Sequence, residues 1–287
     1  MTNSLQIIAD ALTSGTKKYE FVPGDTVSTL DGIKLTRIKA LVAIPFHNVK
    51  IGDLGGYLES EKNLSHEGDC WVGGNAHVYD DAQVSGNAEV FGNSLVCGDA
   101  QVYDDAEVSE NAKVSENATV FGDAKVSGNA VVTGNATVSG NAKVTGNAQV
   151  YGKALVCGDA TVFGDAKVSG NAVVTGNAWV SGDAQVYDDA WVYDDAWVYG
   201  NAKVYGNAKV PGTAMVFGNA TVYGDARVYG DARVYGDAQV CGDATVCGDA
   251  EVYGNARVYG NARVYGYAKV CGDAEVYDSL LVYGTFG

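Results

Sequence analysis

The sequence predicts an all-β fold: a parallel β-helix of stacked triangular coils with a small N-terminal α+β cap. Valine occurs at every sixth residue from Val72 to Val282, thirty-six times without an insertion. Alanine follows four residues after these valines, except at Ser94, Leu280 and Phe286. Gly-Asn or Gly-Asp pairs lie between most of them. A short fixed period of this kind is typical of a hexapeptide solenoid.

Each six-residue unit is predicted to form one short strand followed by a corner. Side chains alternate across a strand, so valine and alanine point to one face and their neighbours to the other. Glycine, asparagine and aspartate accept a positive φ at little cost and favour turns. Three units close an eighteen-residue coil with a thin apolar core. About twelve to thirteen coils, at about 4.8 Å per coil, make a rod on the order of 60 Å long.

Repeats of this kind depend on stacking for stability and need covered ends. We expect residues 1–53 to form the N-terminal cap domain and residues 54–287 to form the β-helix. Residues 54–71 keep the six-residue register in degraded form and are expected to be a degenerate first coil. In residues 280–287, bulky Leu280 and Phe286 replace inward alanines and are expected to plug the last coil.

The cap lacks the repeat, so its elements are predicted from local signals. Lys18–Val22 and Lys34–Ile44 are rich in strand-forming residues. Asp31-Gly32 lies between them and is typical of a hairpin turn. We expect Thr2–Leu12 to be a short helix.

The net charge of −16 lies entirely on the repeat. Residues 1–65 hold seven acidic and seven basic residues, which leaves 28 acidic and 12 basic residues in 66–287. An acidic surface disfavours direct binding of nucleic acid or anionic membranes and favours basic partners or solubility. The corner aspartates therefore have three readings: turn geometry and solubility, imitation of DNA, or calcium binding. The last lacks the GGxGxD pattern of calcium-binding repeats.

The sequence favours a cytoplasmic protein. The first residues, MTNSLQIIADALTSG, lack the basic start of a signal peptide, and no segment has the length of a membrane span. The six cysteines do not align as a disulfide framework, which suits a reducing compartment.

Aromatic and arginine residues concentrate on the second half of the repeat. The residue after valine is tyrosine in three of the first nineteen units but in twelve of the last seventeen. Tyrosine, tryptophan and arginine are enriched at protein interfaces, although tyrosine ladders also stabilise stacked strands. The candidate protein-binding residues are Trp179, Trp197, Tyr187, Tyr205, Tyr223, Arg227, Arg233, Arg257 and Arg263.

The sequence contains few candidates for catalytic residues. The histidines are His47 in the cap, His66 at an expected core position and His77 on the first regular coil. None lies beside a long loop that could hold a substrate, and no phosphate-binding loop or zinc-ligand cluster occurs in the sequence. We therefore predict no catalytic, cofactor-binding or metal-binding residues and no cofactor.

The unit V-x-G-[N/D]-A-x resembles the hexapeptide repeat of the acyltransferases that have a left-handed β-helix. The resemblance implies a left-handed coil. Those enzymes carry an inserted loop and a catalytic histidine near a trimer interface where acyl-CoA binds. This chain lacks the inserted loop, and none of its histidines can be matched to the catalytic one.

A second resemblance involves the cap and the first coil. The segments are Lys18-Tyr-Glu-Phe, Arg37-Ile-Lys-Ala-Leu, Asn48-Val-Lys-Ile-Gly-Asp-Leu-Gly-Gly-Tyr, Asn63-Leu-Ser and Cys70-Trp-Val. They look like a family common in phages and prophages, whose members are labelled acyltransferases or polymer-forming proteins because of the repeat. This resemblance implies a phage-related origin.

These observations favour a non-enzymatic binding or structural rod, phage-encoded and acting by protein–protein interaction in the bacterial cytoplasm. Its acidic surface suits an inhibitor of a host defence protein or a DNA-binding protein. The alternative is an acyl-CoA-dependent hexapeptide acyltransferase. The sequence leaves the oligomeric state open among monomer, dimer and trimer.

Overall fold

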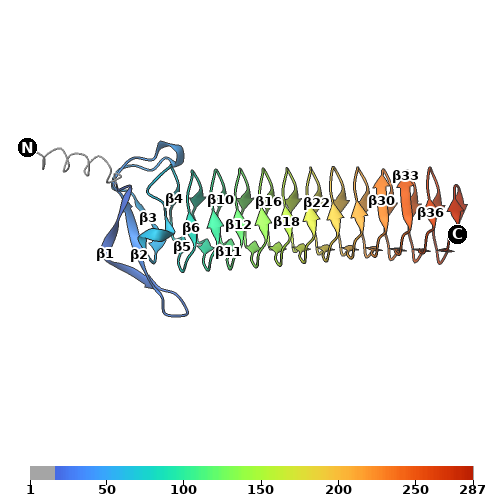
Figure 1. Ribbon diagram of the computed structural model, residues 1–287, viewed down its shortest axis with the longest axis horizontal. Coiled ribbons are helices and arrows are strands. Elements are labelled where there is room, and N and C mark those ends of the chain that lie inside the picture. Colours follow the sequence, from blue (N-terminus) through green and yellow to red (C-terminus); the bar gives the residue numbers. More distant parts are fainter. Residues whose placement is uncertain (1–16, 287) are drawn as a thin grey trace, which may run out of the picture.

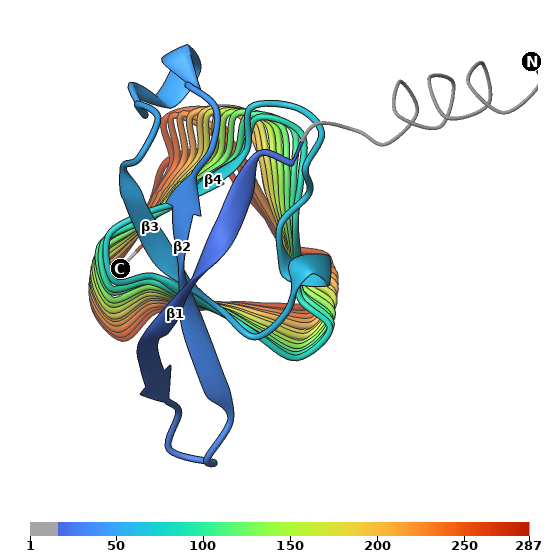
Figure 2. The same ribbon diagram turned by 90° about the vertical axis from the view of Figure 1, so that its left-hand side faces the viewer.

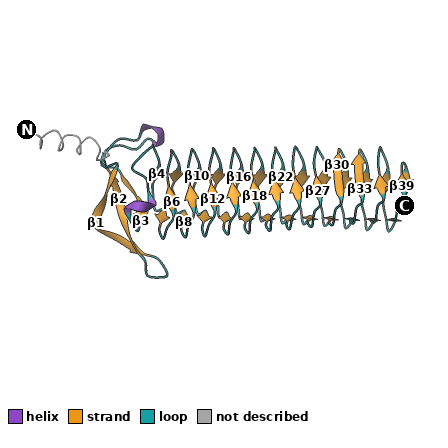
Figure 3. Ribbon diagram, in the orientation of Figure 1, coloured by secondary structure: helices purple, strands orange, loops and turns teal. Residues whose placement is uncertain are grey.

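The computed structural model describes residues 17–286 and shows an all-β parallel solenoid of about 13 turns, with almost no helix (Figures 1 and 3). The predicted all-β parallel solenoid is confirmed, and the α+β cap stays a prediction. The rod carries the N-terminal strands at one end and the C-terminus at the other. The helix expected at Thr2–Leu12 lies outside the described residues, and the left-handed sense of the coil stays a prediction.

Three sheets run the length of the rod, and seen along the rod axis they enclose a three-sided core (Figure 2). Each strand pairs in parallel with the strands one coil before and one coil after it, and almost all solenoid strands are two residues long. We call the sheets faces 1, 2 and 3.

Face 1 continues from the N-terminal hairpin. Its solenoid strands are β3 (Leu54–Leu58), β5 (His77–Val78), β8 (Leu95–Val96), β11 (Lys113–Val114), β14 (Val131–Val132), β17 (Gln149–Val150), β20 (Lys167–Val168), β23 (Gln185–Val186), β26 (Lys203–Val204), β29 (Thr221–Val222), β32 (Gln239–Val240), β35 (Arg257–Val258) and β38 (Glu275–Val276).

Face 2 precedes face 1 by a third of a coil, so the chain runs through faces 2, 1 and 3 in that order. Its strands are β4 (Trp71–Val72), β7 (Glu89–Val90), β10 (Glu107–Val108), β13 (Lys125–Val126), β16 (Lys143–Val144), β19 (Thr161–Val162), β22 (Trp179–Val180), β25 (Trp197–Val198), β28 (Met215–Val216), β31 (Arg233–Val234), β34 (Glu251–Val252), β37 (Lys269–Val270) and β40 (Thr285–Phe286).

Face 3 completes each coil. Its strands are β6 (Gln83–Val84), β9 (Gln101–Val102), β12 (Thr119–Val120), β15 (Thr137–Val138), β18 (Leu155–Val156), β21 (Val173–Val174), β24 (Trp191–Val192), β27 (Lys209–Val210), β30 (Arg227–Gly230), β33 (Thr245–Gly248), β36 (Arg263–Val264) and β39 (Leu281–Val282).

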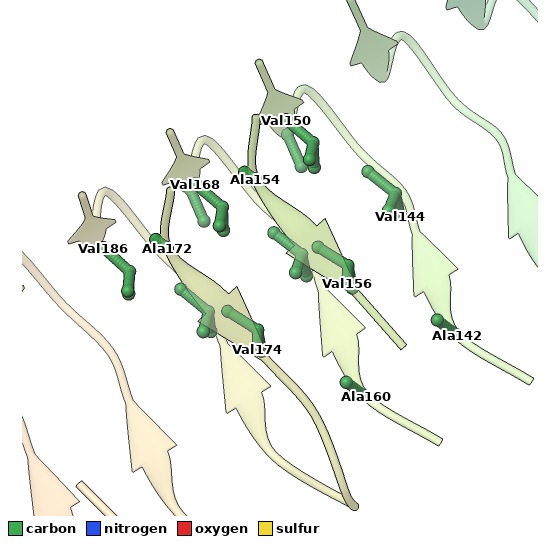
Figure 4. Close-up of a cluster of buried hydrophobic side chains, with 14 of the residues drawn as sticks. Ala142, Val144, Val150, Ala154, Val156, Ala160, Val168, Ala172, Val174 and Val186 are labelled. Carbon is green, nitrogen blue, oxygen red and sulfur yellow. The ribbon is translucent and has the colours of Figure 1, made fainter. Parts of the chain in front are cut away.

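The core consists of the repeated valines and alanines. Val156, Ala160 and their equivalents in neighbouring coils point inward and are fully buried (Figure 4). Backbone hydrogen bonds hold adjacent coils in an eighteen-residue register; for example, the N–H of Thr137 donates to the carbonyl of Ala154 over 2.9 Å. Each coil therefore buries its apolar side chains only with the help of its neighbours.

The corners require a positive φ, which explains the repeated glycine. Gly140 has φ +68°, and a Cβ there would lie 3.0 Å from the backbone N of Gly158 in the next coil. Seven corners in the described part of the chain carry an acidic residue instead, with φ near +60°. Four of them are Asp80, Asp104, Asp188 and Asp194. Their carboxylates accept a backbone N–H from the next coil, which helps to offset the cost of the left-handed backbone.

The N-terminal strands extend face 1. Strands β1 (Tyr19–Ser28) and β2 (Lys34–Ala40) form an antiparallel hairpin, β2 pairs with β3, and β3 pairs in parallel with β5. The two predicted strands are thus present, although β2 ends before Ile44, which bridges to Val49 around the short 3-10 helix η1 (Pro45–His47). A second 3-10 helix, η2 (Glu61–Asn63), follows β3. The division at residue 53 stays a prediction.

The register predicted for the first coil is wrong by two residues. Leu58 pairs with Val78 and Leu64 bridges to Val84, so twenty residues separate the partners instead of eighteen. Both leucines are fully buried, whereas His66, which was expected in a core position, is only partly buried. The two extra residues follow Leu64, and the larger leucine side chains bury more apolar area than Ser60 or His66 would.

The C-terminal end also departs from the expected register. Phe286 pairs with Val270, sixteen residues earlier, and so takes a valine position instead of an alanine position. Leu280 keeps its predicted place, since its carbonyl accepts the N–H of Arg263. Leu280 and Phe286 are 44% and 40% exposed, so they cover the last coil only in part.

Candidate interaction surface

The nine predicted binding residues lie on all three faces. Consecutive coils bring the three tyrosines together and the two tryptophans together, whereas each arginine lies two coils from the nearest predicted residue on its own face. The prismatic shape separates the three groups. Face 1 carries Tyr187, Tyr205, Tyr223 and Arg257; face 2 carries Trp179, Trp197 and Arg233; face 3 carries Arg227 and Arg263.

On face 1 the three tyrosines form a stacked ladder. The ring centroids of Tyr187 and Tyr205 are 4.7 Å apart, and those of Tyr205 and Tyr223 are 5.0 Å apart, with nearly parallel planes. Cys241 continues the row, and its hydrogen bond with Tyr223, together with burial, raises the pKa of Tyr223 to about 12. These rings are only partly exposed, so the ladder stabilises the coils and offers mainly its edges to a partner.

On face 2 the indoles of Trp179 and Trp197 stack with centroids 5.1 Å apart. Each of these two tryptophans is about 40% exposed. Beside them runs a second ladder, whose residues are not among the nine predicted ones. It consists of Tyr199, Phe217, Tyr235 and Tyr253, with successive ring centroids 4.8, 4.9 and 5.0 Å apart.

On face 3, between Tyr193 and Tyr265, the tyrosines that follow the strand valines do not stack on one another, because they occur only on every second coil. Elsewhere on this face Tyr103 stacks on Phe121, and the ring centroid of Tyr283 lies 5.3 Å from that of Tyr265. Tyr193, Tyr229 and Tyr265 follow the strand valines, and the smaller Pro211 and Cys247 occupy the coils between them. A shallow hollow of about 460 Å³ is lined by Tyr193, Pro211 and Tyr229. A similar hollow of about 480 Å³ is lined by Tyr229, Cys247 and Tyr265.

Cationic side chains line the same two hollows. Lys209 and Arg227 border the first hollow together with one acidic residue, Asp194, and Arg227 and Arg263 border the second. Within residues 17–286, none of these three side chains forms an ion pair, although Asp225 and Asp243 lie nearby. We call the row from Tyr193 to Tyr265, with these cations, the face-3 groove. The tyrosines of this groove recur every thirty-six residues in the sequence, which is twice the length of one coil.

Many corner carboxylates take part in hydrogen-bonded ladders. Asn87 donates to Asp105, Asn141 to Asp159 and Asn177 to Asp195, each over 2.8 Å and one coil apart. Where amide and carboxylate alternate, like charges are not stacked directly above one another, although aspartates follow one another at some corners, as at Asp105 and Asp123 or Asp231 and Asp249. The geometry favours the first reading of the acidic corners, a role in the turns.

The histidines have structural partners. His47 Nε2 lies 2.7 Å from the carbonyl oxygen of Asn87, and its Nδ1 lies 3.3 Å from Glu89. Burial acts to lower the pKa of His47, but the hydrogen bond and charge of Glu89 outweigh it, so the pKa is raised. The ring of His66 stacks on Tyr19 at 4.4 Å, and burial lowers its pKa.

His77 packs edge-on against Tyr57. Over residues 17–286, no group of three or more histidine, cysteine or acidic side chains is placed to hold a metal ion. The same part of the chain contains no helix with the length and apolar character of a membrane span.

A comparison with protein families agrees with this architecture. The chain is a β-solenoid repeat protein, and the family model described as "YdcK Beta solenoid repeat" matches eight stretches of it. These stretches are residues 82–98, 124–140, 166–182, 184–200, 226–241, 238–254, 250–266 and 256–272. A search of curated proteins found no match.

Proposed function

We propose that this chain is a non-enzymatic rod that binds a partner protein through the flanks of its C-terminal half. The main support is that strongly exposed aromatic side chains are concentrated in the C-terminal half of the solenoid. Trp179, Trp191, Trp197, Tyr229 and Tyr265 are each between 38% and 45% exposed. Such residues contribute most of the binding energy at many protein interfaces.

The N-terminal half of the solenoid provides the contrast. Between residues 55 and 178, Tyr151 is the one large apolar or aromatic side chain that is strongly exposed. Both halves share the same Val–Ala core and corner geometry, so coil stability alone does not account for the difference. Exposed aromatic area concentrated on one part of a surface is typical of an interaction site.

The narrower predictions remain predictions: a phage origin, a cytoplasmic location, homo-oligomer formation, and inhibition of a host defence or DNA-binding protein. The Asn–Asp ladders favour a structural use of the acidic corners and lend DNA imitation no particular support. Acyl-CoA-dependent acyl transfer stays the alternative drawn from the resemblance, and no feature of the flanks favours it.

The test is capture of a partner from a lysate of the cells that naturally contain the protein. The test variant carries Trp179→Thr, Trp191→Val and Trp197→Thr. The first two substitutions introduce the residue found one coil earlier, Thr161 and Val173, and the third places a threonine on the next coil after position 179. In the control, Tyr151→Thr restores the residue at Thr133. We expect a specific protein whose recovery falls roughly tenfold with the triple variant and stays unchanged with the control. Equal recovery by all three proteins, or no specific capture, would refute the proposal.

A further inference from the structure

The face-3 groove repeats at twice the period of the fold. Tyr193, Tyr229 and Tyr265 form three rungs, and each pair of rungs brackets one hollow over a smaller residue, Pro211 or Cys247. The two hollows are of nearly equal volume. A ligand that occupies both must itself repeat along the rod axis.

The rung spacing selects a ligand conformation. Coils are stacked about 4.8 Å apart, so rungs on alternate coils are about 9.6 Å apart. A polyproline-II helix repeats every three residues, or about 9.3 Å. Over the two intervals from Tyr193 to Tyr265 the mismatch is about 0.6 Å.

Other polypeptide conformations fit less well. Side chains on one face of a β-strand recur every 6.6–6.8 Å or so, which does not match the rungs. Seven residues of α-helix span about 10.5 Å, and the mismatch doubles over two intervals to about 1.8 Å. The groove also crosses the strands, and every face-3 strand from β9 to β36 is already paired on both sides, so a ligand cannot add as another strand there.

The charge of the groove specifies the ligand further. Arg227 and Arg263 lie on the same coils as Tyr229 and Tyr265, and Lys209 lies on the coil before Arg227. All three side chains are exposed and have no ion-pair partner within residues 17–286. Because the arginines recur at the rung spacing, they suit one carboxylate per turn of the ligand. Arginine can bind a carboxylate through two parallel hydrogen bonds.

We propose that the face-3 groove binds a polyproline-II segment of a partner protein, with prolines in the two hollows and an acidic residue at every third position. The inference rests on the proposed function and names the class of partner segment. Aromatic-lined grooves are the established means of recognising this conformation, and a segment that is already extended loses little entropy on binding.

The test uses the full chain and three fluorescent fifteen-residue peptides. (Glu-Pro-Pro)5 carries both the conformation and the charge, (Ser-Pro-Pro)5 lacks the charge, and (Glu-Gly-Ser)5 keeps the charge spacing without the conformation. We expect saturable binding of the first peptide in fluorescence anisotropy and roughly tenfold weaker binding of the other two. Equal binding of (Glu-Gly-Ser)5, or no saturable binding of (Glu-Pro-Pro)5, would overturn the proposal.

Matched variants locate the site. Arg227→Thr with Arg263→Thr removes two charges from face 3 and introduces the residue native to the coil between them, Thr245. Arg233→Thr with Arg257→Thr removes the same charge from faces 2 and 1. We expect roughly tenfold weaker binding from the first pair only, with unchanged thermal unfolding for both pairs. Equal loss with both pairs would reduce the binding to general electrostatic attraction and contradict the proposal.

Two further measurements complete the test. Tyr229→Thr with Tyr265→Thr opens the hollows without changing the charge and should also abolish binding. Polygalacturonate serves as an anionic glycan probe, and tighter binding of it than of (Glu-Pro-Pro)5 at this groove would assign the groove to glycans and overturn the proposal. If a partner protein is still captured from the lysate but (Glu-Pro-Pro)5 does not bind, only this inference fails. If the capture of a partner does not depend on the exposed aromatic residues of the flanks, the proposed function fails.

Discussion

The side-chain amide of Asn141 donates a 2.8 Å hydrogen bond to the carboxylate of Asp159, which occupies the same corner one coil further along. The arrangement recurs at other corners, for example from Asn147 to Asp165 over 2.9 Å. The choice between asparagine and aspartate at a corner therefore depends on the residue one coil away. A strongly acidic rod can stack its corners because amides separate many of its carboxylates.

Asn141→Asp should destabilise the rod at neutral pH. It replaces the donated hydrogen bond with a carboxylate between those of Asp123 and Asp159, each about 4.8 Å away, and like charges directly opposite one another across strands cost up to about 1 kcal/mol per pair. The thermal unfolding midpoint should fall at pH 7, and the fall should shrink as the medium is acidified and the carboxylates are protonated. Asp159→Asn, which recreates the amide pair seen from Asn129 to Asn147, is the control and should have little effect. An equal fall for both variants would contradict the ladder interpretation.

Two adjacent valines test the core. Val174 points inward and is fully buried, whereas its neighbour Val173 is partly exposed on face 3. Val174→Ala removes two buried methyl groups and leaves a cavity that neighbouring coils fill poorly, at a cost of roughly 2 kcal/mol in the free energy of unfolding. Val173→Ala should cost roughly 0.5 kcal/mol. Chemical denaturation of both variants measures the difference, and similar losses would mean that the inward face is assigned wrongly.

The corner at Gly140 tests the backbone requirement. Gly140→Ala places a Cβ on a residue with φ +68° and 3.0 Å from the backbone of Gly158, which should cost at least about 1–2 kcal/mol. Gly140→Asp meets the same strain, but its carboxylate can accept the N–H of Gly158 as Asp104 accepts that of Gly122. The aspartate variant should therefore unfold at a higher temperature than the alanine variant. The reverse order would show that the native aspartate corners are tolerated for another reason.

His47 makes the attachment of the N-terminal segment sensitive to pH. Its pKa in the folded protein is raised above the ordinary value near 6.5, so its contribution is complete below about pH 6.5 and is lost as the pH rises through the folded pKa. His47→Gln should therefore lower the unfolding midpoint more at about pH 5.5 than at about pH 8.5.

His66 provides a control of opposite sign. Burial lowers its pKa, so the neutral ring stacked on Tyr19 contributes stability that is lost as the pH falls through the ordinary range of histidine. The difference between His66→Gln and the native protein should be larger at about pH 8.5 than at about pH 5.5. If both variants show the same pH trend, the histidines are not responsible for it.

The fold was largely predictable because one apolar pattern determines nearly every coil. The valine period places the strands, the Gly-Asn and Gly-Asp pairs place the corners, and the alternation assigns the buried face. The first coil was less predictable, because Leu58 and Leu64 follow the same six-residue spacing as the repeat but are offset from it by two residues. β3 also pairs with the N-terminal hairpin, and this contact is not local in sequence.

The candidate surface was predictable in part for a related reason. The eighteen-residue period by itself puts Trp197 one coil after Trp179 and Tyr187, Tyr205 and Tyr223 in one row, and the structure has both arrangements. The face-3 groove escaped that assignment because Tyr193, Tyr229 and Tyr265 recur only on alternate coils. Its hollows arise from the small residues between the rungs, and a search for large side chains alone does not find them.

The most direct test of the account is site-specific photo-crosslinking at two tyrosines of similar exposure. A photoreactive phenylalanine derivative replaces Tyr229 on face 3 in the C-terminal half, or Tyr151 on face 1 in the N-terminal half. After irradiation in the native lysate, the account predicts a discrete covalent adduct with one protein from position 229 and none from position 151. Adducts of equal yield at both positions, or an adduct at position 151 alone, would contradict a binding surface on the flanks of the C-terminal half.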